Sequence, residues 1–125
     1  MRLRKYVENL LRKYSDIIIN VDEFDVHCRP HVIIIKLKLT LRDLSKVYIR
    51  EVRRNDVMVA YSYYWLTESY KVIEGWDNAP HHPEIHTFPH HRHKDNKVYP
   101  LKSPSLETFF REIKRKMERC AGEDC

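Results

Sequence analysis

In this 125-residue chain, the side chains that could act in catalysis or metal binding are concentrated in a histidine-rich segment from about residue 77 to residue 96. Six histidines fall within thirteen residues: His81, His82, His86, His90, His91 and His93. An imidazole titrates near neutral pH, so a group of them can exchange protons, bind a metal ion or sense pH. The alternative is a purely structural role, in which these side chains cap turns and form hydrogen bonds with the backbone of a glycine-poor loop. We expect any chemistry of the protein to lie in this segment.

Cleavage of RNA without a metal ion is the first chemistry that the segment suits. This reaction needs a base for the ribose 2′-hydroxyl, an acid for the leaving oxygen and a cation for the phosphate charge. We predict that Asp77 orients one imidazole ring by accepting its other N–H. The predicted acid and base come from four histidines: His81, His82, His90 and His91. The neighbouring Arg92, His93 and Lys94 are predicted to bind substrate phosphate, and this interpretation requires no cofactor.

A divalent metal centre, holding zinc or a similar ion, is the second interpretation. Neutral imidazole is the commonest metal ligand, and three histidines with one water form a catalytic zinc site. Side chains an even number of residues apart share one side of an extended segment, which groups His91 with His93 and His86 with His90. The candidate ligands are His86, His90, His91 and His93. The spacing matches no established zinc motif, because Pro83 stands where an HExxH motif has its glutamate.

Two helices and one sheet must position this segment. Apolar residues at helical spacing predict a helix over about residues 2–14, and Ser103-Pro104 predicts the start of a second that ends near Arg119. Strands are predicted over residues 17–26, 32–41, 44–52, 57–66 and 70–76, with a short one at 97–99. The separators are short, so successive strands should be antiparallel neighbours. The predicted class is α+β, with a mainly antiparallel sheet of four to six strands and with an N-terminal and a C-terminal helix packed on one face of that sheet.

Aromatic and basic side chains on the predicted strands suit RNA. Tyr63 and Trp65 are predicted to stack on exposed bases, and Lys36, Lys38 and Arg50 to contact phosphates. One face of the 57–66 strand must be core, and the pattern leaves open whether the face that carries Tyr63 and Trp65 is the buried one.

The composition predicts a single domain over residues 1–125 with an irregular tail from residue 120. A net charge of +5 suits a polyanionic partner, and equally serves solubility. Two glycines exclude Gly-rich phosphate loops, and three cysteines without a CxxC motif argue against a disulfide framework.

Neither a signal peptide nor a membrane-length apolar run is evident, so we expect a cytoplasmic protein. An exposed edge strand would allow a homodimer.

Three sequence blocks resemble the TumE-type toxin family. They are Tyr61-Ser-Tyr-Tyr-Trp65, Asp77-Asn-Ala-Pro-His-His-Pro-Glu84 and Thr87-Phe-Pro-His-His-Arg-His93, and the resemblance extends from about residue 17 to residue 118. It carries over no catalytic role. The positions that match the family blocks are Asp77, Asn78, His81, His82, His90, His91 and His93. In relatives we expect a basic residue at the place of Gly75, for which Arg92 or Lys71 would substitute here.

The resemblance implies the toxin component of a type II toxin–antitoxin pair, with a cognate DNA-binding antitoxin encoded by the adjacent gene. The expected topology is similar to that of RelE- or barnase-type ribonucleases. The favoured hypothesis is therefore a toxin that acts on RNA through its histidine loop without a metal. A metal-dependent hydrolase or nuclease on the same histidines is the alternative, and a non-enzymatic protein-interaction module is the third hypothesis.

Overall fold

A computed structural model of the chain describes residues 2–122, with side chains up to Arg119. The elements in chain order are α1 (Arg2–Lys13), β1 (Ile18–Cys28), β2 (Val32–Leu41), β3 (Lys46–Arg54), β4 (Val57–Leu66), β5 (Val72–Asp77), β6 (His91–Lys94), β7 (Lys97–Pro100) and α2 (Leu106–Gly122). The irregular tail was predicted to begin at residue 120, but α2 continues to Gly122, and residues 123–125 lie outside the described part.

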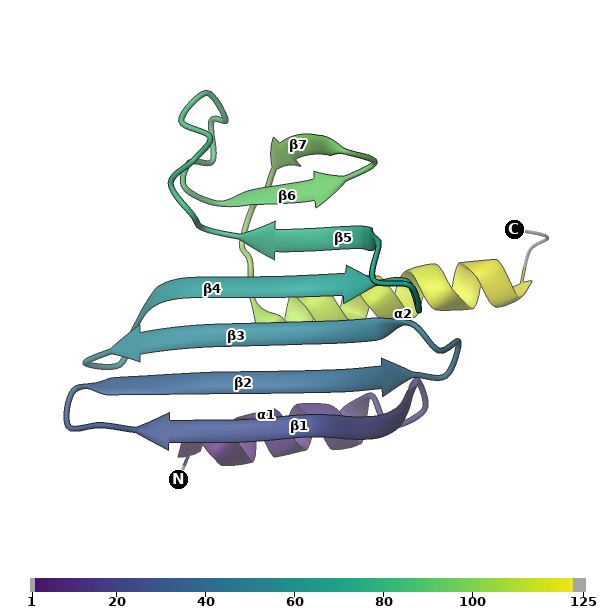
Figure 1. Cartoon of the computed structure of the whole chain (residues 1–125), viewed down its shortest axis with the longest axis horizontal. Helices are drawn as coiled ribbons and strands as arrows, with labels where there is room; N and C mark the ends of the chain where they lie inside the picture. Colours follow the sequence, from purple (N-terminus) through teal and green to yellow (C-terminus); the bar gives the residue numbers. More distant parts are fainter. Residues whose placement is uncertain (1, 123–125) are drawn as a thin grey trace.

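The strands form one seven-stranded sheet in which each pairs with its neighbour in the chain and every pair is antiparallel. Both helices lie against the same face of this sheet (Figure 1). The predicted α+β class is confirmed, with seven strands in place of the four to six expected. The additional strand is β6, whose His-Arg-His-Lys sequence lacks the β-branched and aromatic residues by which a strand is recognised.

A two-residue turn explains why β6 forms despite its composition. Asp95 and Asn96 both adopt positive φ angles, 53° and 60°, and join β6 to β7 as a tight hairpin. Aspartate and asparagine tolerate this left-handed backbone better than other non-glycine residues, and such turns match the twist of paired strands. The hairpin brings β6 into antiparallel register with β5.

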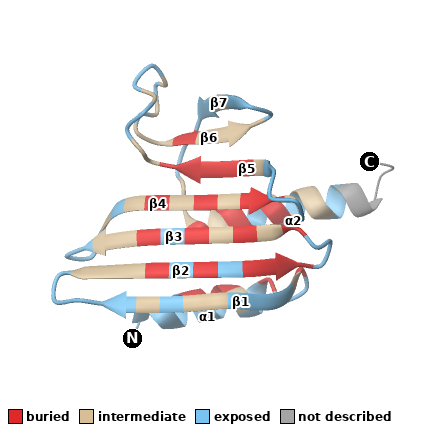
Figure 2. Ribbon diagram, in the orientation of Figure 1, coloured by how far each residue is buried: buried red, intermediate tan, exposed pale blue. Residues whose placement is uncertain are grey.

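The core fills the space between the sheet and the two helices. On the sheet side it takes the alternate positions of β2 that the sequence predicted, with Ile35, Leu37 and Leu39 at most 1% exposed. On the helix side it takes Phe109 and Phe110 of α2, both at most 1% exposed. Figure 2 shows these buried positions concentrated in the central strands, with the edge strands β1 and β7 largely outside them.

The N-terminal end of α2 differs in detail from its prediction. The cap is Ser105, whose Oγ accepts a hydrogen bond from the backbone N–H of Thr108 at 3.1 Å. Ser103, which was expected to cap the helix, instead adopts a positive φ angle of 50° in the preceding turn. Ser103-Pro104 therefore belongs to the turn that leads into the helix.

The sheet has a second face, which we call the open face, because neither α1 nor α2 covers it. Tyr63 and Trp65 point to the helix side, so Tyr64, which stands between them on the same strand, points to the open face. The pairing of Tyr64 with Gly75, and of Ser62 with Asp77, carries the open face onto β5. Part of the histidine-rich segment, His91 to Lys94 in β6, pairs with β5 at that end of the sheet.

Candidate active site

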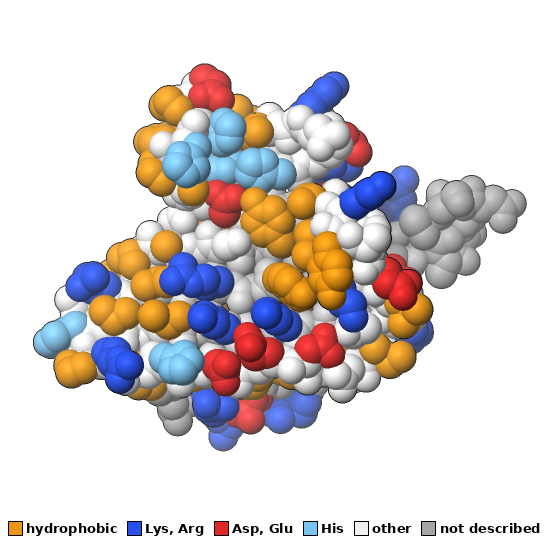
Figure 3. All heavy atoms as spheres, in the orientation of Figure 1, with side chains coloured by type: hydrophobic (Ala, Val, Ile, Leu, Met, Phe, Trp, Pro, Cys, Tyr) orange, Lys and Arg blue, Asp and Glu red, His pale blue; other side chains and the backbone are white. Residues whose placement is uncertain are grey.

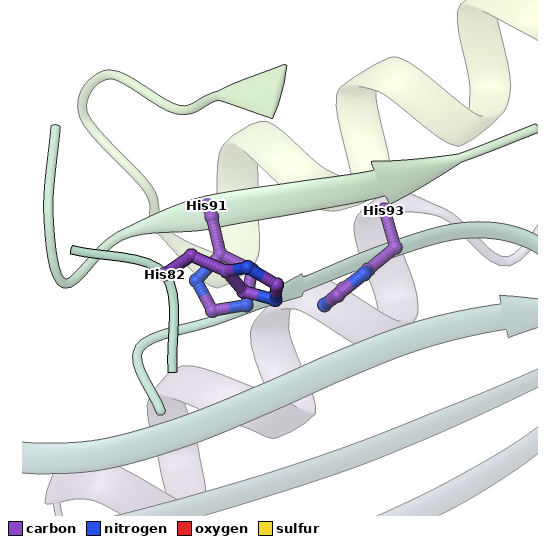
Figure 4. A group of neighbouring side chains, drawn as sticks. All are labelled: His82, His91 and His93. Atoms are coloured by element: carbon purple, nitrogen blue, oxygen red, sulfur yellow. The ribbon is translucent and has the colours of Figure 1, made fainter. Parts of the chain in front are cut away.

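Four side chains from β5, β6 and the preceding loop meet at one edge of the open face. Register places Asp77 opposite His91 and Gly75 opposite His93, so Asp77 and both histidines point to the same side. His82 reaches them from the loop, with its ring centroid 4.9 Å from that of His91 and 5.9 Å from that of His93 (Figure 4). The rings of His91 and His93 are 4.7 Å apart. We call Asp77, His82, His91 and His93 the Asp77–histidine cluster.

Asp77 is the centre of this cluster and is only 9% exposed. Its Oδ1 accepts a hydrogen bond from the backbone N–H of Ala79 at 3.0 Å and lies 2.9 Å from Nε2 of His91. Its Oδ2 accepts the Tyr64 hydroxyl at 2.8 Å and lies 3.3 Å from Nε2 of His93. Both carboxylate oxygens are therefore engaged, and one carboxylate orients two imidazole rings.

His91 is the most deeply buried of the histidines in the cluster, at 2% exposed. Its Nδ1 lies 3.0 Å from the carbonyl oxygen of Pro89, while its Nε2 faces Asp77. A carbonyl and a carboxylate can only accept hydrogen bonds, and a neutral imidazole has a single N–H to give. If the N–H at Nδ1 is donated to Pro89, the contact between Nε2 and Asp77 requires a hydrogen or a metal cation at Nε2.

Tyr64 supports the cluster from β4. Its ring stacks on that of His93 with centroids 6.1 Å apart. Burial, the hydrogen bond to Asp77 and the charge of that carboxylate all raise the pKa of Tyr64, so its hydroxyl stays a donor. Gly75 makes room for the ring, because a Cβ at that position would lie 2.3 Å from Cε2 of Tyr64. A larger residue, including the basic one expected in relatives, would require Tyr64 to move.

Burial also lowers the pKa of His93, and the charge of nearby His91 acts in the same direction, whereas Asp77 opposes the shift. The side chain of His93 is 30% exposed and that of His82 is 29% exposed. Nδ1 of His82 lies 3.2 Å from a carboxylate oxygen of the exposed Glu84. The cluster thus combines a buried interior, at Asp77 and His91, with two rings that solvent can reach.

The remaining histidines of the segment lie elsewhere. His90 contacts Tyr61, with its Nδ1 2.8 Å from the phenol oxygen. His81 and His86 are exposed in the loop. Of the four histidines predicted as acid and base, the structure brings His91 into contact with Asp77 and His82 next to His91. It places His81 and His90 elsewhere.

The four predicted metal ligands are divided in the same way. His91 and His93 converge, as their spacing on one strand predicted, whereas His86 and His90 do not join them. Their place is taken by His82. The imidazole nitrogens of His82, His91 and His93 lie within 4.8 Å of one another.

Asn78, which matches the family block, fixes the path of the chain beside the cluster. Its side-chain oxygen accepts the backbone N–H of Tyr61 at 3.0 Å, and its side-chain nitrogen donates to the carbonyl of Val59 at 3.2 Å. These two bonds tie the end of β5 to β4. Asn78 therefore positions Asp77 without entering the cluster.

The predicted substrate-binding residues lie mostly on the helix side. Arg92 alternates with His91 and His93 along β6 and pairs with the buried Glu74 at 2.7 Å. Lys94 points to the same side as Arg92 by the same alternation. Tyr63 and Trp65 are buried in the core, at 1% and 6% exposed, so the face left undecided by the sequence is the buried one. Among the predicted substrate contacts, His93 alone belongs to the cluster.

The open face supplies other candidates for substrate contact. Lys36, Lys38 and Arg50 are exposed there, as the sequence predicted, and with Tyr48 they line a groove of about 320 Å³. Lys38 Nζ lies 5.0 Å from the centre of the Tyr48 ring. Figure 3 shows basic and hydrophobic side chains on this face, with histidine side chains gathered at its β5–β6 end.

Sequence reasoning missed Tyr64, although a signal was present. The 57–66 strand carries aromatic residues at both odd and even positions, so each face of it had to display at least one ring. Once Tyr61, Tyr63 and Trp65 are assigned to the core, Tyr64 must point to the open face.

Comparison with known proteins gives one match. A model of a toxin family, described as Toxin TumE, matches residues 7–118. No curated protein and no solved structure matches the chain, so the expected likeness to RelE- or barnase-type ribonucleases stays a prediction. In the described residues, neither helix is long and apolar enough to cross a membrane. Because the match covers most of the sequence, the chain belongs to the TumE toxin family, and thus to the toxins of toxin–antitoxin systems.

Proposed function

We propose that this chain is a type II toxin that cleaves RNA at the Asp77–histidine cluster. The observation that carries the proposal is the convergence of three imidazoles, two of them in contact with one buried carboxylate, at the edge of an uncovered sheet face. Core packing does not account for His82 and His93, because the side chains of both are about 30% exposed. Titratable side chains gathered in this way are typical of functional sites.

The cluster contains the groups that phosphodiester cleavage needs. An imidazole can take a proton from the ribose 2′-hydroxyl, a second can return one to the leaving oxygen, and a positive charge stabilises the phosphate. Asp77 holds the rings of His91 and His93 in fixed orientations. The same residues serve cleavage with or without a bound metal ion, and removal of metal ions separates the two routes.

The open face supports RNA as the substrate. Single-stranded nucleic acids bind to surfaces that combine basic side chains with aromatic rings on which bases stack. Lys36, Lys38 and Arg50 provide exposed positive charge, and Tyr48 lies among them. Tyr48 pairs with Tyr64 across β3 and β4, so this surface leads directly to the cluster.

Toxins of this class have an antitoxin partner. We propose that the partner is a DNA-binding antitoxin from the neighbouring gene, and that it neutralises the toxin in the cytoplasm by covering the cluster. The sheet ends in two edge strands, β1 and β7, through which a homodimer could form. Size measurement of the free toxin and of its complex tests both points.

RNA cleavage by the purified chain tests the proposal. Asp77→Asn and His93→Ala should abolish cleavage and relieve toxicity, whereas His81→Ala and His86→Ala, in exposed histidines of the same segment, should change neither. Each variant is compared with the parent by circular dichroism and thermal unfolding. The absence of cleavage at every divalent-ion concentration, combined with a tight antitoxin complex, would establish the non-enzymatic module instead.

A further inference from the structure

We propose that the Asp77–histidine cluster binds one divalent transition-metal ion, with His82, His91 and His93 as nitrogen ligands and Asp77 as the adjacent carboxylate. The inference deepens the proposed function, on which it rests for the role of the ion in RNA cleavage. The binding itself follows from the geometry of these four residues and can be measured without RNA.

Distances between the candidate ligand atoms suit a single ion. Ligand atoms around a tetrahedral zinc ion with bonds of roughly 2.1 Å lie about 3.4 Å apart. The nitrogens of the three histidines lie within 4.8 Å of one another, so modest ring movements bring them to that spacing. The carboxylate oxygens of Asp77 already lie 2.9 Å from Nε2 of His91 and 3.3 Å from Nε2 of His93.

The orientation of His91 supports the same conclusion. Metal-binding histidines commonly donate their second ring N–H to a backbone carbonyl, which fixes the tautomer and aims the free nitrogen at the metal. For His91 the backbone carbonyl is that of Pro89, whose oxygen lies 3.0 Å from Nδ1. The lone pair of Nε2 then faces an Asp77 oxygen 2.9 Å away. Both atoms are electron-pair donors, so a cation bound to both would stabilise this arrangement.

The ligand types indicate which ions fit. Imidazole nitrogen suits zinc, iron, nickel and copper, whereas magnesium and calcium prefer sites made of oxygen ligands. His91 and His93 stand two residues apart on β6, and Asp77 faces them from β5. The sheet therefore holds two of the three nitrogen ligands and the adjacent carboxylate in place. A bound ion of this class can polarise a phosphate oxygen or lower the pKa of a bound water.

Binding to the full-length, metal-free chain is the experiment. Cobalt(II) titration reports the coordination geometry through visible absorption, and equilibrium dialysis with zinc reports the stoichiometry. We expect one ion per chain and tetrahedral or five-coordinate cobalt spectra. His82→Ala and His93→Ala remove partly exposed ligands and should each weaken binding by at least about 10-fold. His81→Ala and His86→Ala are the matched controls and should bind as the parent does.

Two results would overturn the metal site. One is the absence of stoichiometric binding by the folded parent chain. The other is an equal loss of affinity in the His81 or His86 controls, which would mean that the loop merely collects ions.

The failure of this inference is distinguishable from that of the proposed function. A chain that binds one ion through His82 and His93 but cleaves no RNA keeps the metal site and refutes the ribonuclease. Cleavage that survives complete removal of metal, in a chain that binds no ion, refutes the metal site and keeps the ribonuclease.

Discussion

Two buried carboxylates on β5, Glu74 and Asp77, are held in opposite ways. Glu74 is 1% exposed and faces the helix side, where Arg92 lies 2.7 Å from it and Lys116 of α2 lies 2.5 Å from it. The indole N–H of Trp76 donates to the same carboxylate at 2.7 Å. Asp77 is 9% exposed and faces the open side, where its charged or chargeable neighbours are imidazoles.

The difference lies in whether the partners can change. Arginine and lysine keep their charges throughout the physiological pH range, so the Glu74 group is a fixed tie between α2, β5 and β6. Imidazoles near Asp77 can gain or lose a proton or bind an ion. Side-chain alternation along β5 thus places Glu74, which stabilises the fold, on one face of the sheet and Asp77, the proposed functional carboxylate, on the other.

The largest effect on activity is expected from Asp77→Asn. The amide keeps the size of the side chain but loses the charge that orients His91 and His93 and the oxygen that would face a metal ion. We expect RNA cleavage to fall by about 100-fold or more, with a much smaller effect on folding. Cleavage rates per folded molecule measure this, and a variant that retains parental activity would remove Asp77 from the chemistry.

Glu74→Gln should produce the reverse result. Removal of the charge leaves Arg92 and Lys116 partly buried without their partner, at 28% and 19% side-chain exposure. We expect the free energy of unfolding to drop by about 3 kcal/mol, measured by urea denaturation. Cleavage per folded molecule should be little changed. If activity instead fell as far as in Asp77→Asn, the two carboxylates would not be separable in function.

Gly75→Ala tests how the cluster depends on its neighbours. The added Cβ would lie 2.3 Å from the Tyr64 ring, so the ring must move away from Asp77 and His93. We expect a loss of about 1–3 kcal/mol in stability from this overpacking, together with reduced cleavage. An unchanged cleavage rate at reduced stability would mean that the position of Tyr64 does not matter to the chemistry.

Tyr64→Phe should have the smallest effect of the four. It removes the hydrogen bond to Asp77 and keeps the ring that stacks on His93. A loss of about 1 kcal/mol in stability and a several-fold decrease in cleavage are expected. Tyr99→Phe is the matched control, because Tyr99 on β7 is 37% exposed and pairs with Arg92, whose side chain faces away from the cluster. Equal effects of the two variants would contradict a specific role for the Tyr64 hydroxyl.

Local pattern was sufficient for most of the scaffold. The alternation from Ile33 to Leu41 predicted both the β2 strand and the face it buries, and short polar separators predicted that the strands pair in chain order. The strand β6 was not predicted, because its histidines and basic residues show no apolar pattern. Its pairing with β5 depends on the hairpin at Asp95 and Asn96.

The sequence by itself determined that histidines are concentrated between β5 and β7, and that Asp77 stands at the start of that segment. The spacing also predicted that His91 and His93 share one side, but only the tertiary structure decided that they meet Asp77 and His82. His91 and His93 reach Asp77 through strand register, and His82 reaches them through the return of the loop, whereas neighbouring His90 turns to Tyr61. Register and loop path depend on contacts between residues distant in the chain, and spacing along the sequence does not encode them.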